Sequence, residues 1–565
     1  MGVASVLSQL DAALSDLVGQ WNGYSTGLAT VLVLVITYSI FSRVDPDIHP
    51  MLLARQAQGS PVRSEGESPV YRGNSAPHGM PLNSGLNVKP KGASKWSQGK
   101  DGDLRDVWRR VVSGSEDGAA KGRILTVQGR EKVIEHKLGE ITRAINLLGQ
   151  HISQQGGSKV AIYLPNSVEF LATLFACSFY NLSAIVIPFD ESADAIISML
   201  RQSGADTVVT VSGAFPLDSV VKSYPSLKQL IWVVEQGSSH LDWNEVPEGV
   251  GGKVNVSTWQ DILHDSPVSA GIDLPSEPES TSSVGFFWKS KSGAQEELVQ
   301  FSHANLVAAI SAQLTAVPTT QRLSPADLFL SAAPLSASFP LVLTLAALYS
   351  NASVAFNSVA GPVADIVLAT GGIAPTVIVA TPQTLQKTHG ESSGKIGSAL
   401  ASTAHWIQRR SLVQNGAMPV ASFLSSYNEK IKPDIGTTPG KLRLVYVADY
   451  AGTGTPVLNE QTISDLRIFL GARIIYALAA AKVAGSVAQT QFNDYRVHGD
   501  GSGSHFGPPV SSVEIFLKDS GSHKTSEDGQ TIEGEIQVRG PAVSTGVTSL
   551  GIIGKIREDN TLAYL

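Results

Sequence analysis

Short β-branched runs alternate with amphipathic helical segments along most of this 565-residue chain. In the clearest unit, a strand expected at 159–164 leads into a helix that starts at Ser167 and runs to Tyr180, followed by a strand expected at 183–187. A crossover of this length joins parallel strands. The repeated alternation therefore predicts doubly wound α/β layers, and the length suggests two to four folded units.

Further elements continue the pattern. Helices are expected at 131–152 and 194–204 from their apolar spacing. The apolar run 335–348 is short for a bilayer and contains Pro340, so it is interpreted as a buried helix rather than a membrane span. More strands are expected at 206–211, 230–234, 328–332, 353–356, 377–380, 442–447 and 473–476.

The amino terminus contains a long uncharged segment. No charged residue occurs between Leu17 and Ser42, and about 20 apolar residues of helix span a bilayer. Trp21 and Tyr38 stand near its edges, where aromatic residues favour the membrane interface. A cleaved signal peptide would need a basic start, which this chain lacks. We therefore predict a transmembrane helix over 21–42, with a buried amphipathic helix as the alternative.

The charge around this segment predicts its orientation. Arg43 and Arg55 follow it, no lysine or arginine precedes it, and basic residues favour the cytoplasmic side. We expect a single-pass membrane protein with a lumenal amino terminus and a cytosolic carboxy-terminal domain. The endoplasmic reticulum is the expected membrane, with the mitochondrial outer membrane and the lipid droplet as alternatives. The sequons at Asn181, Asn255 and Asn351 would be glycosylated only in the reverse orientation.

Composition defines the remaining organisation. Residues 1–20 form a short amino-terminal segment, and 43–123, rich in Ser, Gly and Pro, are expected to form an extended linker. A short helix is expected to start near Leu104 within this linker, because Leu104, Val107 and Val111 have helical spacing. A folded domain follows over 124–565. The net charge is −7, and the lysine and arginine positions form no basic stripe, so no nucleic-acid partner is expected. A single cysteine, Cys177, excludes an internal disulfide, and no Cys/His cluster indicates zinc.

Four segments of the chain carry a recognisable pattern: KVAIYLPNSVEFLATLFACSFYNLSAIVIPFD, VQFSHANL, KLRLVYVADYAGTGTPVLNEQTISDLRIFLGARIIYAL and EGEIQVRGPAVSTG. In this order they resemble the adenylate-forming superfamily, which includes acyl-CoA synthetases, luciferases and peptide-synthetase adenylation domains. The resemblance covers roughly 125–565. It implies the family's large N-terminal domain: doubly wound α/β subdomains with a small β-rich subdomain. It also implies joining of a carboxylate to AMP from Mg²⁺-bound ATP, and then transfer of the acyl group to a thiol such as coenzyme A.

The resemblance places the triphosphate loop at 289–298, KSKSGAQEEL. Ser290, Ser292 and Gly293 stand at degenerate nucleotide-site positions of this loop. The family's proline and lysine are replaced by Glu296 and Glu297. An anion in place of a cation reverses the sign of a contact worth on the order of 4 kcal/mol at 4 Å and an effective dielectric of 20. Lys289 and Lys291 are the residues that could compensate.

Two further positions depart from the pattern that the resemblance implies. Tyr476 is kept where the family's tyrosine lies against adenine, but the magnesium-binding glutamate is Ala480. Alanine has no oxygen for Mg²⁺, which prefers oxygen ligands. Ile552 replaces the aspartate that holds the ribose. For Ser292, Gly293 and Tyr476 a plain structural role is favoured over nucleotide binding.

The chain ends at Leu565, where the family's hinge and C-terminal lid domain would begin, so that domain is expected to be missing. Together these departures predict a membrane-anchored pseudoenzyme with no catalytic residue, no metal site and no cofactor. It would act as a scaffold, a regulator or an acyl-chain binder. The expected partners are the lipid bilayer and either an acyl chain or an intact acyl-CoA synthetase paralogue. The alternative is an active ATP-dependent acyl-CoA (fatty acid) ligase with atypical ATP contacts, which would need ATP and Mg²⁺.

Overall fold

The computed structural model describes most of the chain and leaves short gaps. The described residues are 15–16, 19, 21–41, 45–90, 92–94, 96–114, 121–129, 132–234, 254–267, 269–275, 282–290, 296–419, 430–498, 503–525 and 532–565.

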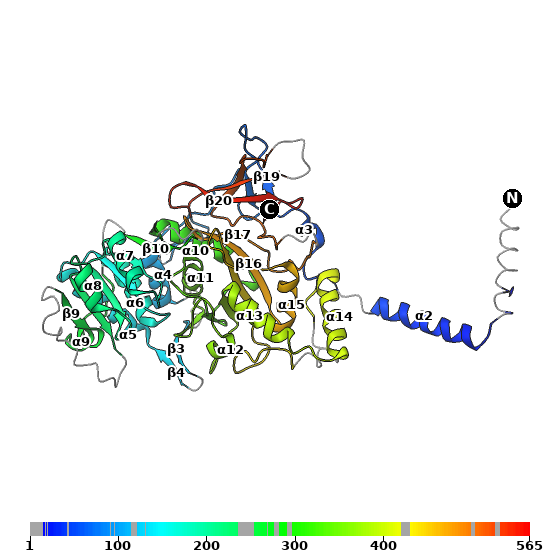
Figure 1. Ribbon diagram of the computed structural model, residues 1–565, viewed down its shortest axis with the longest axis horizontal. Helices are drawn as coiled ribbons and strands as arrows, with labels where there is room; N and C mark the ends of the chain where they lie inside the picture. The colour runs from blue at the N-terminus through cyan, green and yellow to red at the C-terminus, as the bar shows by residue number, and fades with distance from the viewer. Residues whose placement is uncertain are drawn as a thin grey trace.

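Two largely parallel sheets form the body of the protein (Figure 1). In both sheets the inner strands run parallel and an antiparallel hairpin partner lies at an edge. The first sheet has the order β11 (Glu297–Ser302), β10 (Ser283–Trp288), β6 (Ser183–Val186), β5 (Lys159–Tyr163), β7 (Thr207–Val211), β8 (Gln229–Val233) and β9 (Asn255–Thr258). The second has the order β17 (Val483–Gln489), β16 (Arg473–Ala480), β15 (Leu444–Tyr450), β14 (Val377–Ala380), β12 (Leu328–Ser331), β13 (Ser353–Asn357), β3 (Ile124–Gln128) and β4 (Lys132–His136).

Apolar helices between the sheets cover their inner faces. They contact one another and strands of both sheets, and they are α4 (Leu104–Ser113), α6 (Val168–Phe179), α10 (His303–Thr315) and α11 (Ser338–Tyr349). Parallel strands are buried on both faces, so the outer faces need helices as well. On the first sheet, α7 (Ala193–Ser203) and α8 (Leu217–Ser223) pack on the face away from α6. The helices α5 (Leu138–Gln154) and α9 (Trp259–His264) instead pack beside α6, on its side of that sheet. The second sheet is accompanied by α12 (Ile366–Ala369), α13 (Pro382–Ser393), α14 (Ala399–Asn415) and α15 (Glu460–Leu470). Residues 338–348 of α11 are all buried, which confirms the buried-helix interpretation of that run.

A third, antiparallel sheet joins the two ends of the chain. Its order is β1 (Ala57–Gly59), β2 (Tyr71–Gly73), β18 (Glu514–Lys518), β19 (Ile532–Arg539), β20 (Val547–Ile556) and β21 (Leu562–Tyr564). This sheet is the small β-rich subdomain that the resemblance implied. Part of the segment 43–123, which was expected to be an extended linker, completes this sheet. The reason is that the edge of β18 has free backbone groups, which β2 and Ser68 pair. The short helix expected near Leu104 is present as the buried helix α4.

One expected helix begins later than its apolar pattern indicated. Residues 131–152 were expected to be helical throughout, but 132–136 form β4, which pairs antiparallel with β3. His136 Nε2 lies 2.8 Å from Thr126 Oγ1 across this pair. Strand pairing therefore overrides the helical spacing there, and α5 begins at Leu138. The other expected strands and helices are present with small shifts at their ends.

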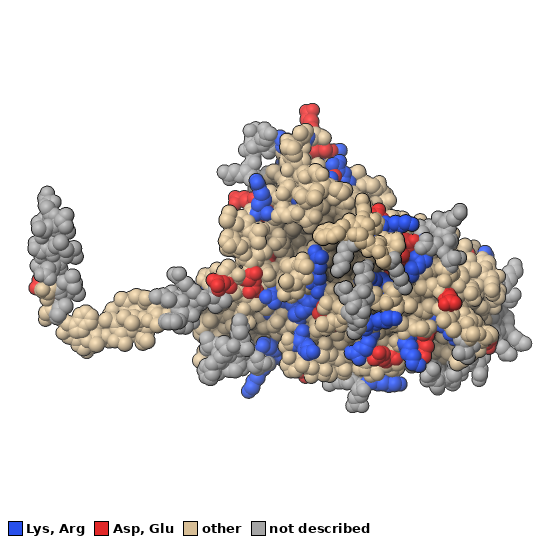
Figure 2. All heavy atoms as spheres, turned by 180° about the vertical axis from the view of Figure 1, so that it is seen from behind, with Lys and Arg blue, Asp and Glu red and all other residues tan. Residues whose placement is uncertain are grey.

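The helix α2 (Gly23–Phe41) projects from the body and carries no charged side chain (Figures 1 and 2). Its first turns are polar, with Thr26 and Thr30 donating hydroxyl hydrogen bonds to the backbone. Leu28 and the side chains from Val31 to Ile36 are exposed. Among the residues that the structure describes, no helix is long and apolar enough to cross a membrane. The transmembrane helix expected over 21–42 is therefore not found in them.

A buried group of charged side chains joins the third sheet to the second. Asp494, fully buried after β17, accepts hydrogen bonds from Gln56 Nε2 at 2.7 Å and from Arg496 Nη2 at 2.6 Å. Arg496 also donates to Asp559 Oδ2 at 2.8 Å. Burial would raise the pKa of Asp494, but the hydrogen bonds from Arg496 and the charge of nearby groups hold it well below its usual range. The network therefore depends on ionised carboxylates.

His505 completes this network as a neutral ring. Its Nδ1 accepts a hydrogen bond from the backbone N–H of Gly507 at 3.1 Å, so the ring proton lies on Nε2, 3.6 Å from Asp494 Oδ2. Burial lowers the pKa of His505 to about 4, and Asp494 opposes that shift. A histidine whose folded pKa lies below its unfolded value stabilises the fold above the unfolded pKa, and this stability is lost as the pH falls.

We expect the free energy of unfolding to fall by on the order of 1 kcal/mol per pH unit between pH 6.5 and about 4 because of His505. Replacing His505→Gln should remove that part of the slope, whereas the exposed His264→Gln variant should keep it. Urea unfolding at a series of pH values measures both. An unchanged slope in the His505→Gln protein would contradict the assignment.

Candidate functional site

Tyr476, the residue expected to lie against adenine, is fully buried on β16. Its hydroxyl oxygen accepts a hydrogen bond from the backbone N–H of Leu458 at 3.2 Å. Its ring centroid lies 5.1 Å from that of Phe506, which lies 4.7 Å from that of Tyr564. Burial raises the pKa of Tyr476. The ring of Tyr476 therefore packs against an aromatic side chain of the protein itself.

The end of β16 holds the position that the resemblance assigns to the magnesium ligand. Residues 477–480 are at most 1% exposed and pair with β15 on one side and β17 on the other. Ala480 stands opposite Val483, next to a register shift in the pairing. Three of these four residues are alanine and the other is Leu478, so their side chains offer no oxygen. This strand end is apolar and enclosed.

The phosphate loop follows β10. Ser290 comes two residues after this strand and is exposed. Ser292 and Gly293, the other loop positions predicted for nucleotide contact, lie outside the described residues, as does Lys291.

The charge at the ends of this loop is neutralised internally. Lys289 Nζ lies 3.6 Å from Glu296 Oε1 and 3.7 Å from Glu191 Oε1. The pKa of Glu296 is raised, first by burial and then by the negative charge of Glu191. The cation proposed to compensate for the missing family lysine therefore already faces two carboxylates.

The structure brings the loop and β16 together, as the resemblance implies. Glu297, at the start of β11, lies 2.9 Å from Lys482 in the turn between β16 and β17. Trp288 at the end of β10 packs against Tyr450 at the end of β15, with ring centroids 5.8 Å apart. The site lies at the carboxyl ends of strands from both parallel sheets, where α/β proteins bind ligands.

Asp449 is a site residue that the sequence interpretation missed. It lies one residue before the end of β15, is buried, and accepts hydrogen bonds from Thr455 Oγ1 at 2.6 Å and from the Tyr564 hydroxyl. Burial raises the pKa of Asp449 although these hydrogen bonds oppose it. An aspartate at the end of an apolar strand was the available signal. Its partner Tyr564 lies on β21, far away in sequence, so only the tertiary structure shows this hydrogen bond.

Ile552 lies on β20, where the resemblance places a ribose aspartate. Its side chain is half-buried and packs against the hydrophobic core. It therefore contributes apolar contact and no hydrogen bond to this position.

The residues present do not fit Mg²⁺-bound ATP. The magnesium position is alanine, the ribose position is aliphatic, and Lys289 is paired with acids. The buried Asp449 carboxyl accepts its hydrogen bonds from this chain's own hydroxyls. A surface hollow of about 270 Å³ lies elsewhere, near Gln56 and Arg322, and Tyr476 does not line it.

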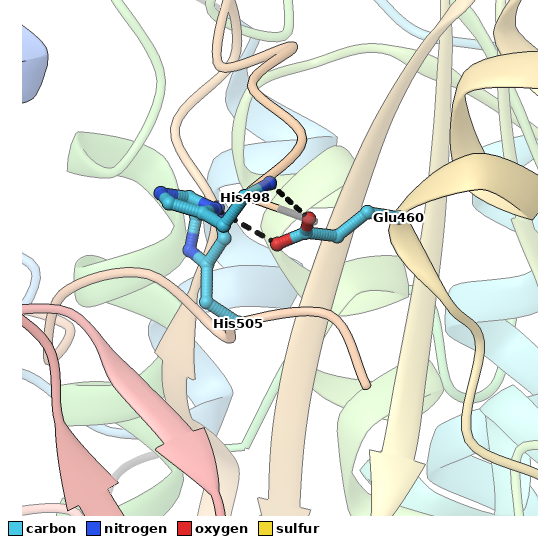
Figure 3. Close-up of side chains that lie close together, drawn as sticks. All are labelled: Glu460, His498 and His505. Atoms are coloured by element: carbon cyan, nitrogen blue, oxygen red, sulfur yellow. Dashed lines mark hydrogen bonds and ion pairs between the residues drawn. The ribbon is translucent and has the colours of Figure 1, made fainter. Parts of the chain in front are cut away.

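A second cluster has the side-chain types of a metal site, one carboxylate and two imidazoles. Glu460 at the start of α15, with His498 and His505 from the segment between β17 and β18, places ligand atoms within 4.8 Å of one another (Figure 3). However, Arg557 Nη1 lies 2.7 Å from His498 Nδ1 and 3.1 Å from Glu460 Oε1. A guanidinium stays charged at any ordinary pH. The cation at this cluster is therefore a side chain, and the cluster fastens β20 to α15. No local spacing in the sequence indicates it.

The chain resembles known proteins over most of its length. Residues 139–547 match the family of AMP-binding enzymes. Long chain acyl-CoA synthetase 3 of Arabidopsis thaliana is 22% identical over 508 residues, which cover 86% of this chain and 70% of the relative. Fatty acyl-CoA synthetase B of Dictyostelium discoideum is 21% identical over 399 residues, which cover 69% of this chain and 55% of the relative.

Solved structures show the same fold at low identity. The anthranilate CoA ligase AuaEII in complex with anthranoyl-AMP matches 82% of this chain and 77% of its own, with a TM-score of 0.56 and 15% identity. The N-terminal domain of FACL13 from Mycobacterium tuberculosis matches 82% of this chain and all of its own, with a TM-score of 0.53 and 13% identity. This chain therefore belongs to the AMP-binding enzyme family and has the α/β fold of the family's N-terminal domain.

Proposed function

We propose that this protein is an acyl-CoA-synthetase-like pseudoenzyme that acts as a scaffold or regulator at a membrane. The distant relationship to long-chain acyl-CoA synthetases supports the link to acyl chemistry. The loss of nucleotide contacts within a preserved fold supports the loss of the reaction. Its proposed partner is an intact acyl-CoA synthetase, whose activity or location it controls, and we expect the two proteins to co-purify.

The observation that carries the proposal is the apolar, enclosed end of β16. Residues 477–480 are almost completely buried and have no side-chain oxygen, so they cannot hold Mg²⁺ against the phosphates. In phosphoryl chemistry the metal neutralises the charge that develops on the transferred group. Losing one preorganised electrostatic contact commonly costs about 10² to 10³ in rate. Losing the metal contact removes a central part of that stabilisation.

The charge of the loop supports the same conclusion. A triphosphate approaching Lys289 would meet Glu191 and Glu296 at the same place. At an effective dielectric of 20, each unit charge at 4 Å contributes on the order of 4 kcal/mol, so two carboxylates outweigh one lysine. The alternative, an active ligase with atypical ATP contacts, depends on Lys289, because Lys289 is the loop lysine that the structure describes.

We expect the purified full-length protein to show no Mg²⁺-dependent ATP binding by calorimetry and no ATP–pyrophosphate exchange with fatty acids. Because Lys289 is already paired with Glu191 and Glu296, the Lys289→Ala variant should likewise give no signal in either assay.

An exchange signal that requires Mg²⁺ and falls in the Lys289→Ala variant would overturn the pseudoenzyme proposal in favour of the ligase. Cooperative urea unfolding of both proteins provides the control for folding.

Membrane association through the amino-terminal segment is the second part of the proposal. The exposed apolar side chains of α2 support it, since a contiguous apolar surface of this kind favours a membrane or a partner. The orientation proposed places the folded body in the cytosol. Of the three sequons, Asn181 and Asn255 are exposed and Asn351 is buried, so the first two are informative.

We expect the full-length protein to co-sediment with endoplasmic reticulum membranes and to show no mobility shift on deglycosylation, because a cytosolic body is not glycosylated. Alkaline carbonate extraction separates integral from peripheral attachment. Glycans at Asn181 and Asn255 would show that the folded body lies in the lumen and not in the cytosol. Recovery of the protein in the soluble fraction would refute membrane association.

A further inference from the structure

The chain is fastened to one end of the body shortly after α2. The backbone N–H of Asp47 donates to Gly416 O at 2.9 Å, directly after α14. Its carboxylate accepts hydrogen bonds from the Tyr495 hydroxyl at 2.7 Å and from Arg473 Nη2 at 2.9 Å. Six residue steps separate Phe41 from Asp47, so they span at most about 20 Å. The carboxyl end of α14 therefore stays close to the end of α2.

The helix α14 is held firmly by its buried face. Ala401 packs with Ile431 and Phe469, and Leu412 packs with Ile468 and Tyr495. Asp465 of α15 lies within ion-pair distance of side chains from α14 as well. The orientation of the outer face of α14 is therefore fixed by packing.

That outer face combines apolar and basic side chains. Leu400 is 64% exposed and Trp406 is 57% exposed. The Arg410 guanidinium lies over the Trp406 ring, 5.4 Å from its centroid, and Arg410 Nε donates to Gln414 Oε1 at 2.7 Å. The sequence of α14, ALASTAHWIQRRSLVQN, contains two arginines and no carboxylate.

Exposed apolar residues also follow the attachment point. Met51 and Leu52, on the short helix α3 (Pro50–Ala54), are 77% and 59% exposed. They lie four and five residues after Asp47, and both α3 and α14 lie on the side of the body from which α2 projects (Figure 1). We call Leu400, Trp406 and Arg410 the α14 surface; Met51 and Leu52 add exposed apolar side chains on α3.

We propose that the α14 surface lies against an anionic lipid bilayer. Tryptophan and arginine together suit the headgroup region, where the indole rests at the interface and the guanidinium reaches lipid phosphates. Arg409 is paired with Asp465 of α15. Arg410, in contrast, has Trp406 and Gln414 as its contacts and can complement anionic lipid. This inference rests on the proposed membrane association, because the short connection holds the surface beside whichever membrane the amino-terminal segment enters.

Contact with lipid can be measured on the full-length protein by a fluorophore at the exposed Thr403→Cys, one turn from Trp406. The native Cys177 does not interfere, because it is buried and burial raises the pKa of its thiol. The matched control is Ser219→Cys, exposed on α8 at the opposite end of the body (Figure 1). The protein is bound to vesicles of phosphatidylcholine, with or without phosphatidylserine, and quenching by brominated lipids is recorded after flotation.

We expect quenching at Thr403→Cys to exceed that at Ser219→Cys by about threefold or more on phosphatidylserine vesicles, and to weaken in high salt. Adding Trp406→Ala and Arg410→Glu should abolish this difference while the protein still floats. Flotation with equal quenching at both positions would overturn the proposed lipid contact of the α14 surface but would not contradict membrane association. Failure to float with any vesicle would overturn both.

Discussion

The fold depends on a shared layer of apolar helices between two parallel sheets. A parallel sheet exposes apolar side chains on both faces, and the crossovers between its strands supply the helices that cover them. Here α6 and α10 belong to the first sheet and α4 and α11 pack against them from the second. Residues 338–348 of α11 have no exposed side chain, so this layer cannot change without opening both sheets.

That constraint explains how the nucleotide site can diverge while the fold persists. The site lies at strand ends, beyond the shared helical layer, where side chains contribute chemistry more than core packing. Ala480, at the position that the resemblance assigns to a metal ligand, is buried and pairs with Val483 of β17. Glu296 lies within ion-pair distance of Lys289 in the loop region. Both arrangements are compatible with a stable protein, and under the proposed function both oppose the binding of a magnesium-bound polyphosphate.

The third sheet and the buried ionic network give the ends of the chain a structural role. Asp494 and Arg496 follow β17 and Asp559 follows β20, so the guanidinium of Arg496 bridges two carboxylates from distant parts of the chain. Such a network fixes orientation more than it adds stability, because burying ions is costly. It joins the third sheet to the second, and Asp47 holds the start of the body against α14 in the same way.

The family resemblance implied the small β-rich subdomain and the missing side-chain oxygen at Ala480. The sequence by itself determined the alternation of strands and helices and the buried nature of α11. These follow from side-chain periodicity and residue chemistry, which are local properties. Only the tertiary structure decided that residues 132–136 pair with β3, that β2 completes the edge of β18, and that Lys289 faces Glu191. These outcomes depend on backbone pairing and charge contacts between distant segments, and the energy of such contacts exists only once the chain has folded.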